Sequence, residues 1–146
     1  MSKKKVIISA CILGEYCRYD GKTKELNAVR EAFKDYEIIP FCPEAPLFGT
    51  PRERISVIKI SNENRIITEK TEVDVTELLE EEILSFCKKH PNPDAIVLKS
   101  KSPSCGYKTT QVLDKNRNFL AFENGIAADI FTEFYSNIEI LDENSF

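Results

Sequence analysis

Three cysteines share a position relative to the segments around them, because each follows a short apolar stretch. Cys11 and Cys42 come directly after two such stretches, and Cys105 lies in the polar loop after a third. Thiolates are soft ligands that prefer zinc or iron–sulfur clusters to hard cations. The chain has no CxxC pair, and its single histidine, His90, lies at the far end of a predicted helix. Three thiolates without a fourth protein ligand leave a coordination position open, as catalytic sites do.

The elements that must position these cysteines are predicted from the spacing of apolar residues. Short runs rich in β-branched residues predict buried strands over residues 6–10, 37–41, 95–98 and 138–141. Apolar residues at helical spacing predict helices over residues 25–35, 74–89 and 126–134. Two apolar runs around a polar turn predict a hairpin over residues 55–60 and 65–68. A short extra strand is predicted over residues 119–122.

The order of these elements predicts the fold class. Strands that alternate with helices indicate right-handed crossovers and a mainly parallel sheet that is covered on both faces. We therefore predict an α/β fold: a small three-layer domain, Rossmann- or flavodoxin-like, with core strand order 2-1-3-4 and a hairpin insertion. The chain shows no internal repeat, low-complexity tract or linker, so residues 1–146 are expected to form a single domain.

The predicted strand order brings the three cysteines together. In open α/β sheets, ligands bind beyond the carboxyl ends of the strands, where the strand order reverses. Adjacent strands lie about 4.8 Å apart, so three neighbouring strand ends span roughly 10 Å. Cys11, Cys42 and Cys105 could therefore hold one inorganic cluster or one metal ion. The competing interpretation is that a cysteine only fills space and binds no metal. We favour it for Cys87, in an amphipathic helix, and for Cys17, in the first loop.

Composition narrows the class of protein. The formal net charge of -4 argues against broad nucleic-acid binding, which requires clustered Lys and Arg. No stretch approaches the roughly 18 apolar residues of a membrane helix, so no membrane partner is expected. An odd number of cysteines, five, without a secretory signal argues against a disulfide framework and predicts a cytoplasmic location. The sequence does not fix the oligomeric state.

Four short motifs occur in order along the chain: SACILG at 9–14, RYDG at 18–21, CPE at 42–44 and SPSCG at 102–106. Each motif alone is unspecific. Their combination, at these spacings, resembles the thiouracil desulfidase family, and the likeness extends from about residue 5 to about residue 135.

The resemblance implies a reaction and the residues that carry it. It implies a 4Fe-4S cluster with three cysteine ligands, here Cys11, Cys42 and Cys105, and one open iron without a protein ligand. That iron would take the sulfur of a small thiolated pyrimidine, so that thiouracil becomes uracil plus hydrosulfide without net redox change. The resemblance also implies catalytic roles for Glu44 and Ser102.

The chemistry of these two residues is compatible with such roles. Replacing C=S by C=O requires water to add to a ring carbon and a proton to move, and a carboxyl group near an anionic cluster can exchange that proton. Without the resemblance, a structural role for Glu44, as a helix cap or as the partner of Arg52, is as strongly favoured as a catalytic one. Ser102 can stabilise a developing charge, but it is also typical of a Ser-Pro turn. Lys99 and Lys101 either offset the charge of a cluster or simply flank a strand.

Substrate contacts are predicted in the first loop and in the last cysteine motif. Arg18, Tyr19 and Asp20 could contact the edge and face of a pyrimidine, although Asp-Gly also forms an ordinary turn, and Ser104 is assigned to substrate binding with them. The loops after CPE and after SPSCG depart from the family pattern, so the identity of the thiolated pyrimidine stays open. The alternative functions are a small-anion or nucleotide-binding α/β module, and a zinc or thiol protein that uses the same cysteines.

Overall fold

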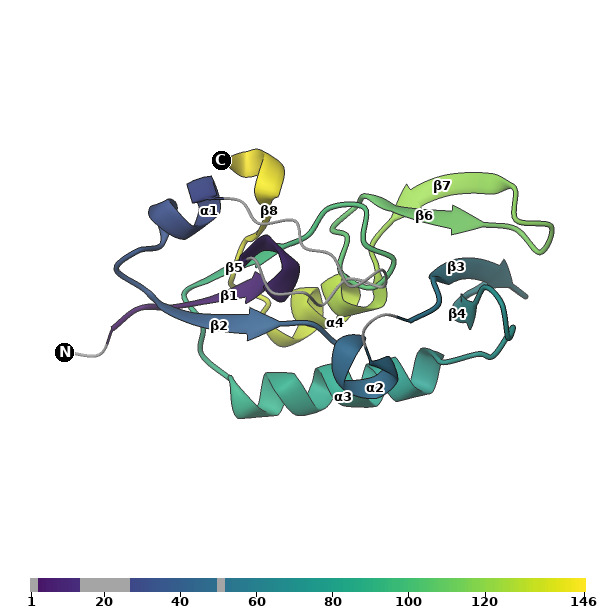
Figure 1. Cartoon of the computed structure of the whole chain (residues 1–146), viewed down its shortest axis with the longest axis horizontal. Helices are drawn as coiled ribbons and strands as arrows, with labels where there is room; N and C mark the ends of the chain where they lie inside the picture. Colours follow the sequence, from purple (N-terminus) through teal and green to yellow (C-terminus); the bar gives the residue numbers. More distant parts are fainter. Residues whose placement is uncertain (1–2, 14–26, 50–51) are drawn as a thin grey trace.

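The computed structural model describes residues 3–13, 27–49 and 52–146, and these residues form two four-stranded sheets (Figure 1). In the first, which we call sheet A, every strand pair is parallel and the order is β2-β1-β5-β8. Its strands are β1 (Lys5–Ser9), β2 (Glu37–Phe41), β5 (Ala95–Leu98) and β8 (Ile140–Asp142). This order confirms the predicted arrangement 2-1-3-4, and β8 begins two residues later than predicted.

Sheet A is buried on both faces, because the crossover helices of a parallel sheet cover it. Ile7 and Ile96 pack against α3 and α4, whereas Val6 and Val97 pack against α1 and the 3-10 turn η1 on the other face. All four side chains are fully buried. The covering elements are α1 (Asn27–Ala32), α3 (Thr76–Lys89), α4 (Ile126–Phe134) and η1 (Ala10–Leu13). The three-layer arrangement is therefore confirmed, although α1 ends earlier than the predicted helix.

Helix α3 shows why the sequence folds locally as it does. Leu79, Ile83 and Cys87 recur every four residues and are all buried, so one face of the helix faces the core. At the N-terminus, the side chain of Asp74 accepts a hydrogen bond from the Thr76 amide at 3.0 Å, which satisfies one of the amides that a helix start leaves unpaired. The helix ends one residue before a proline-containing loop.

The second sheet, sheet B, contains the predicted hairpin and a strand that the sequence analysis missed. Its order is β4-β3-β6-β7, with β3 (Ile55–Ile60), β4 (Glu63–Thr68), β6 (Thr110–Leu113) and β7 (Phe119–Glu123). Ser61 and Asn62 both have positive φ, at 52° and 67°, as a tight two-residue hairpin turn requires. The missed strand, β6, pairs in parallel with β3 and antiparallel with β7. The predicted hairpin insertion is thus half of a complete sheet.

The two sheets share one hydrophobic core. Ile7 of β1, Val57 of β3 and Val112 of β6 belong to the same buried cluster as the inner faces of α3 and α4. Two short elements complete the fold: α2 (Ala45–Phe48), which follows the CPE motif, and the C-terminal 3-10 turn η2 (Glu143–Ser145). Among the described residues, no helix has the length and apolar character needed to span a bilayer.

Candidate active site at the carboxyl end of sheet A

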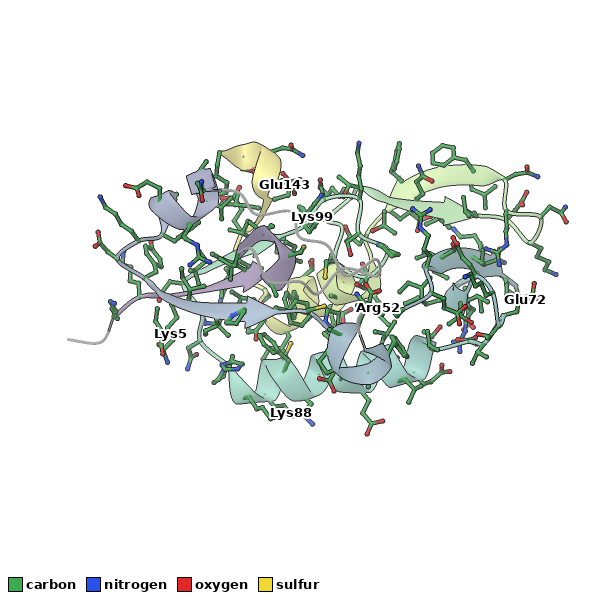
Figure 2. All side chains as sticks on the ribbon, viewed as in Figure 1. Lys5, Arg52, Glu72, Lys88, Lys99 and Glu143 are labelled. Atoms are coloured by element: carbon green, nitrogen blue, oxygen red, sulfur yellow. The ribbon has the colours of Figure 1, made fainter. Side chains whose placement is uncertain are left out.

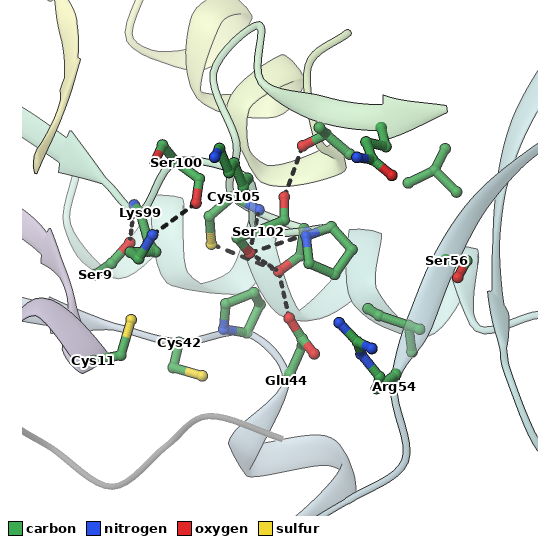
Figure 3. Close-up of a pocket in the computed structure, with 18 of the residues that line it drawn as sticks. Ser9, Cys11, Cys42, Glu44, Arg54, Ser56, Lys99, Ser100, Ser102 and Cys105 are labelled. Atoms are coloured by element: carbon green, nitrogen blue, oxygen red, sulfur yellow. Dashed lines mark hydrogen bonds between the residues drawn. The ribbon is translucent and has the colours of Figure 1, made fainter. Parts of the chain in front are cut away.

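A cavity of about 610 Å³ lies where the carboxyl ends of β1, β2 and β5 face sheet B (Figure 3). Cys11, Cys42 and Cys105 all line it, and Figure 3 shows their side chains gathered around one part of the cavity. Residues of β3 and β6, including Ser56 and Gln111, form its opposite wall. The predicted meeting of three strand ends is therefore present in the structure.

Each cysteine is delivered by a different local structure. Cys11 lies in η1, immediately after β1, and Cys42 follows the last residue of β2; both are partly exposed. Cys105 is buried, with 5% of its surface exposed. Burial raises the pKa of the Cys105 thiol well above its usual range, and the negative charges of Cys42, Glu44 and Cys11 raise it further. The three thiols are therefore close enough to influence one another electrostatically.

The loop that carries Cys105 is fixed by its own serine and by helix α4. The hydroxyl oxygen of Ser102 accepts hydrogen bonds from the amides of Ser104, at 3.3 Å, and Cys105, at 3.1 Å. The interpretation of Ser102 as a turn residue is thus confirmed, while its catalytic role stays a prediction. At the start of α4, the amide of Ala127 donates to the carbonyl of Ser104 at 2.7 Å. A Cβ at Gly125 would lie 2.6 Å from backbone atoms of Ser104, so only glycine permits this close approach.

Glu44 is buried beside this loop, with 8% of its surface exposed. Its Oε2 accepts a hydrogen bond of 2.7 Å from the Ser104 hydroxyl, and its Oε1 lies 3.4 Å from Nε of Arg52 in a buried ion pair. The expected pairing of Glu44 with Arg52 is therefore present, together with a contact that the sequence analysis did not foresee. Glu44 does not cap α2 with its side chain.

Ser102, Ser104 and Glu44 form a continuous chain of polar groups, part of which is drawn in Figure 3. The hydroxyl oxygens of Ser102 and Ser104 lie 3.4 Å apart. Because the two backbone amides can only donate to Ser102, its own hydroxyl hydrogen is available for Ser104, and the hydroxyl of Ser104 donates to Glu44. This arrangement connects Ser102 to the carboxylate of Glu44 through Ser104, and all three residues line the cavity.

Ser104 is predicted to bind substrate, but its hydroxyl is buried and already bonded to Glu44. The residue nevertheless lines the cavity. Its assignment to substrate binding stays a prediction. Arg18, Tyr19 and Asp20, also assigned to substrate binding, lie outside the described residues, as does Cys17.

Cys87 packs in the hydrophobic core behind sheet A and is absent from the cavity wall. Burial raises the pKa of its thiol. The interpretation of Cys87 as a packing residue, favoured from its place in an amphipathic helix, agrees with this position.

Sequence reasoning missed two residues that shape the site. Gly125 is one, because its contact with the cysteine loop spans twenty residues of sequence. The other is Glu143, whose carboxylate accepts hydrogen bonds from Lys99 and Ser100 at the cavity wall. Neither residue belongs to a recognisable motif, so only the fold reveals them.

The described part of the chain contains no set of three or more His, Cys, Asp or Glu side chains arranged to hold one metal ion. Cys11, Cys42 and Cys105 nevertheless line one cavity, and their thiolates are soft ligands of the kind that zinc and iron–sulfur clusters accept.

Comparison with known proteins agrees with this geometry. The sequence model of the 2-thiouracil desulfurase family matches residues 6–143. The uncharacterized protein YbbK of Bacillus subtilis (strain 168) is 34% identical over 111 residues, and the match covers 69% of this chain and 72% of YbbK. Among solved structures, the 4Fe-4S-dependent thiouracil desulfidase TudS is 26% identical, with a TM-score of 0.69, over 99% of this chain and 93% of TudS. The chain belongs to the 2-thiouracil desulfurase family.

Proposed function

We propose that this chain is a thiouracil desulfidase whose cofactor is a 4Fe-4S cluster held by Cys11, Cys42 and Cys105. The observation that carries the proposal is that these three cysteines, from three strand ends, line one cavity together with the buried carboxylate of Glu44. The structural likeness to TudS supports the choice of a cluster over a zinc ion. We further propose that the reaction is hydrolytic and non-redox.

The residues present suit a cluster chemically. The buried Cys105 thiol resists ionisation by itself, and binding of a cationic metal centre supplies the charge that allows it to lose its proton. Three cysteine ligands leave one of four irons without a protein ligand, and when bound, the cluster supplies there a Lewis acid that accepts the sulfur of the substrate.

The balance of the reaction defines what the protein side chains must do. The oxygen of water adds to the ring carbon, the carbon–sulfur bond breaks, and sulfur leaves as hydrosulfide while the carbon becomes a carbonyl. No atom changes its oxidation state. The oxygen of water must lose both of its protons to become the carbonyl oxygen: one is delivered to the sulfur, which leaves as hydrosulfide, and the other must be taken up by a base. Glu44 is held as an acceptor by Arg52 and Ser104, and we assign it as the base that takes the proton from water.

Ser102 is assigned to stabilise the negative charge that develops on oxygen when water adds to the ring carbon. Its hydroxyl is held at the cavity wall by two backbone amides, so it is already oriented before substrate binds, as stabilisation of a developing charge requires. Its link to Glu44 through Ser104 gives the removed proton a path that does not cross bulk solvent.

The substrate is a thiolated pyrimidine in this proposal. A cavity of about 610 Å³ falls in the range of roughly 300–1,000 Å³ that small-molecule sites occupy, and it is ample for one pyrimidine. Arg18, Tyr19 and Asp20 are proposed to contact the ring, together with Ser104. We propose a cytoplasmic location, because the cluster and its thiolates require reducing conditions.

The test is an anaerobic one. Protein purified without oxygen should contain iron and acid-labile sulfide and should release hydrosulfide from 2- or 4-thiouracil. Glu44→Gln should keep its iron but lose about 10²–10⁴-fold in kcat, which is the usual contribution of general acid–base catalysis. Glu80→Gln, at an exposed position of α3, is the matched control and should behave as wild type. Protein that binds zinc instead of iron after reconstitution, or that keeps iron without releasing hydrosulfide, would refute the proposal.

A further inference from the structure

The C-terminal turn of the chain reaches back to the cysteine cavity mainly through Glu143, and the side-chain amide of Asn144 adds a longer contact of 3.4 Å to the Ser100 hydroxyl. Glu143, the first residue of η2, has a side chain that is 10% exposed. Its Oε1 accepts a hydrogen bond of 2.7 Å from the amide of Ser100, and its Oε2 accepts from the hydroxyl of Ser100, also at 2.7 Å. Figure 2 shows Glu143 and Lys99 close together. Glu143 itself does not line the cavity, whereas Ser100 does.

The third contact of Glu143 is a partly buried ion pair. Nζ of Lys99, on a side chain that is 21% exposed, donates to Oε2 of Glu143 at 2.7 Å and to the carbonyl of Ser100 at 3.0 Å. The amide of Lys99 donates to the hydroxyl of Ser9 at 2.9 Å. Residues 99 and 100 are therefore tied to β1 on one side and to the segment after β8 on the other, and both line the cavity.

This anchoring point lies at the start of the loop that carries Cys105. Immediately after Ser100, Lys101 adopts a positive φ of 62°, a conformation that costs free energy for a residue with a side chain. The far end of the loop is held by α4 through Ser104. A strained loop keeps one conformation only when its surroundings fix it on both sides, and Glu143 fixes the near side.

We propose that Glu143 is a positioning residue of the active site, which acts through Ser100 and Lys99. Its carboxylate fixes the start of the cysteine loop, and its negative charge partly offsets the positive charge that Lys99 brings to the cavity wall. The electrostatic half of this inference rests on the proposed function, because the charge matters to the reaction only if an anionic cluster occupies the cavity. The mechanical half does not depend on it.

Hydrogen exchange of anaerobically purified protein tests the mechanical half. In Glu143→Ala, amides of peptides that cover residues 99–105 should exchange about 10- to 100-fold faster, as expected for loss of a hydrogen bond to a charged group. Glu143→Gln keeps one oxygen for the Ser100 amide and should fall between Glu143→Ala and wild type. The matched control, Glu139→Gln, changes the same charge at an exposed position four residues earlier and should leave the loop unchanged. Unchanged exchange in Glu143→Ala, or faster exchange throughout β1 and β5 as well, would overturn the proposal.

The reduction potential of the bound cluster tests the electrostatic half. A purely structural role of Glu143 would not make the potential shift in opposite directions when Glu143 and Lys99 are neutralised. Removing the negative charge in Glu143→Gln should raise the potential, because an uncompensated Lys99 stabilises the reduced form, and Lys99→Gln should lower it. Glu139→Gln should leave it unchanged. Shifts of the same sign in both variants would overturn this half. Absence of any cluster would refute the proposed function and the electrostatic half, while the exchange experiment would still decide the mechanical one.

Discussion

Sheet A and sheet B contribute to the same cavity but differ in how completely they are buried. The central strands of sheet A are closed off on both faces, and Ile7, Ile96 and Val97 are fully buried. Sheet B ends in β7, where Phe119 is 53% and Phe122 57% exposed. Both sheets pack on one core. The two sheets therefore differ in solvent exposure: the central strands of sheet A are covered, whereas the edge strand β7 of sheet B is exposed.

This difference in burial accompanies different contributions of the two sheets to the cavity. Parallel strands covered by helices hold their carboxyl ends in fixed positions, and those ends carry the cysteines. The antiparallel pairs at the two edges of sheet B tolerate solvent on one side. Its central strands β3 and β6, which pair in parallel, form the opposite wall of the cavity. Of the two segments that the sequence analysis set apart from the family pattern, 45–55 leads into β3 and 107–118 contains β6. We infer that sheet A fixes where a cluster binds, while sheet B and its loops decide what binds next to it.

The largest effect is expected from removing a cysteine at the end of a sheet A strand. Cys105→Ser should abolish iron binding and with it hydrosulfide release, because a hydroxyl is a much poorer ligand for iron than a thiolate. Cys87→Ala is the matched control, since Cys87 is buried like Cys105 but does not line the cavity, and it should retain iron. Iron and acid-labile sulfide analysis measures both variants. Equal iron content in Cys105→Ser and wild type would break the assignment of sheet A as the ligand platform.

The burial difference itself predicts different costs in stability. Ile96→Ala in sheet A should lower the free energy of unfolding by about 2–5 kcal/mol, because it leaves a cavity in a fully buried layer. Leu120→Ala on exposed β7 should cost less than about 1 kcal/mol. Urea unfolding of both variants under the same conditions measures the contrast. Comparable costs at the two positions would mean that β7 is covered in solution.

A third change acts on the contact between α4 and the cysteine loop. Gly125→Ala places a methyl group against backbone atoms of Ser104, and we expect it to lower the free energy of unfolding by about 1–3 kcal/mol. Because the displaced loop carries Cys105, iron occupancy should fall as well. The control is Ala128→Gly within α4, which weakens the helix by about 1 kcal/mol and removes one buried methyl group from the core, without adding an atom beside Ser104. Full iron occupancy in Gly125→Ala would show that the loop adapts.

The smallest effect is a pH dependence at Glu143. Burial opposes ionisation of this carboxyl, but hydrogen bonds from Lys99 and Ser100 outweigh it and lower its pKa below the ordinary value of 4.5. A lowered pKa in the folded state contributes stability above the unfolded-state pKa, and this contribution is lost as the pH falls through the folded-state value. The stability difference between wild type and Glu143→Gln should thus be constant above about pH 5.5 and shrink below pH 4.5. A difference that grows on acidification would contradict it.

Part of the site could be predicted because its signals are local. Apolar segments followed by a cysteine predicted both the strand order and the meeting of Cys11, Cys42 and Cys105 at one cavity. Strand β6 was missed because its four residues carry only a short and mixed apolar pattern, and Val112 is its one buried apolar residue. Residues 110–113 form a strand because they pair with β3, which is distant in the sequence.

The sequence by itself determined the parallel sheet, its strand order and the cysteine positions, because burial on both faces makes each central strand a short continuous apolar run. The tertiary structure alone decided which polar groups meet at the cavity: Ser104 with Glu44, Glu143 with Ser100, and Gly125 with the cysteine loop. These contacts join residues between about twenty and sixty positions apart. No periodicity encodes such pairs, because a hydrogen bond depends on where two separate segments end in space.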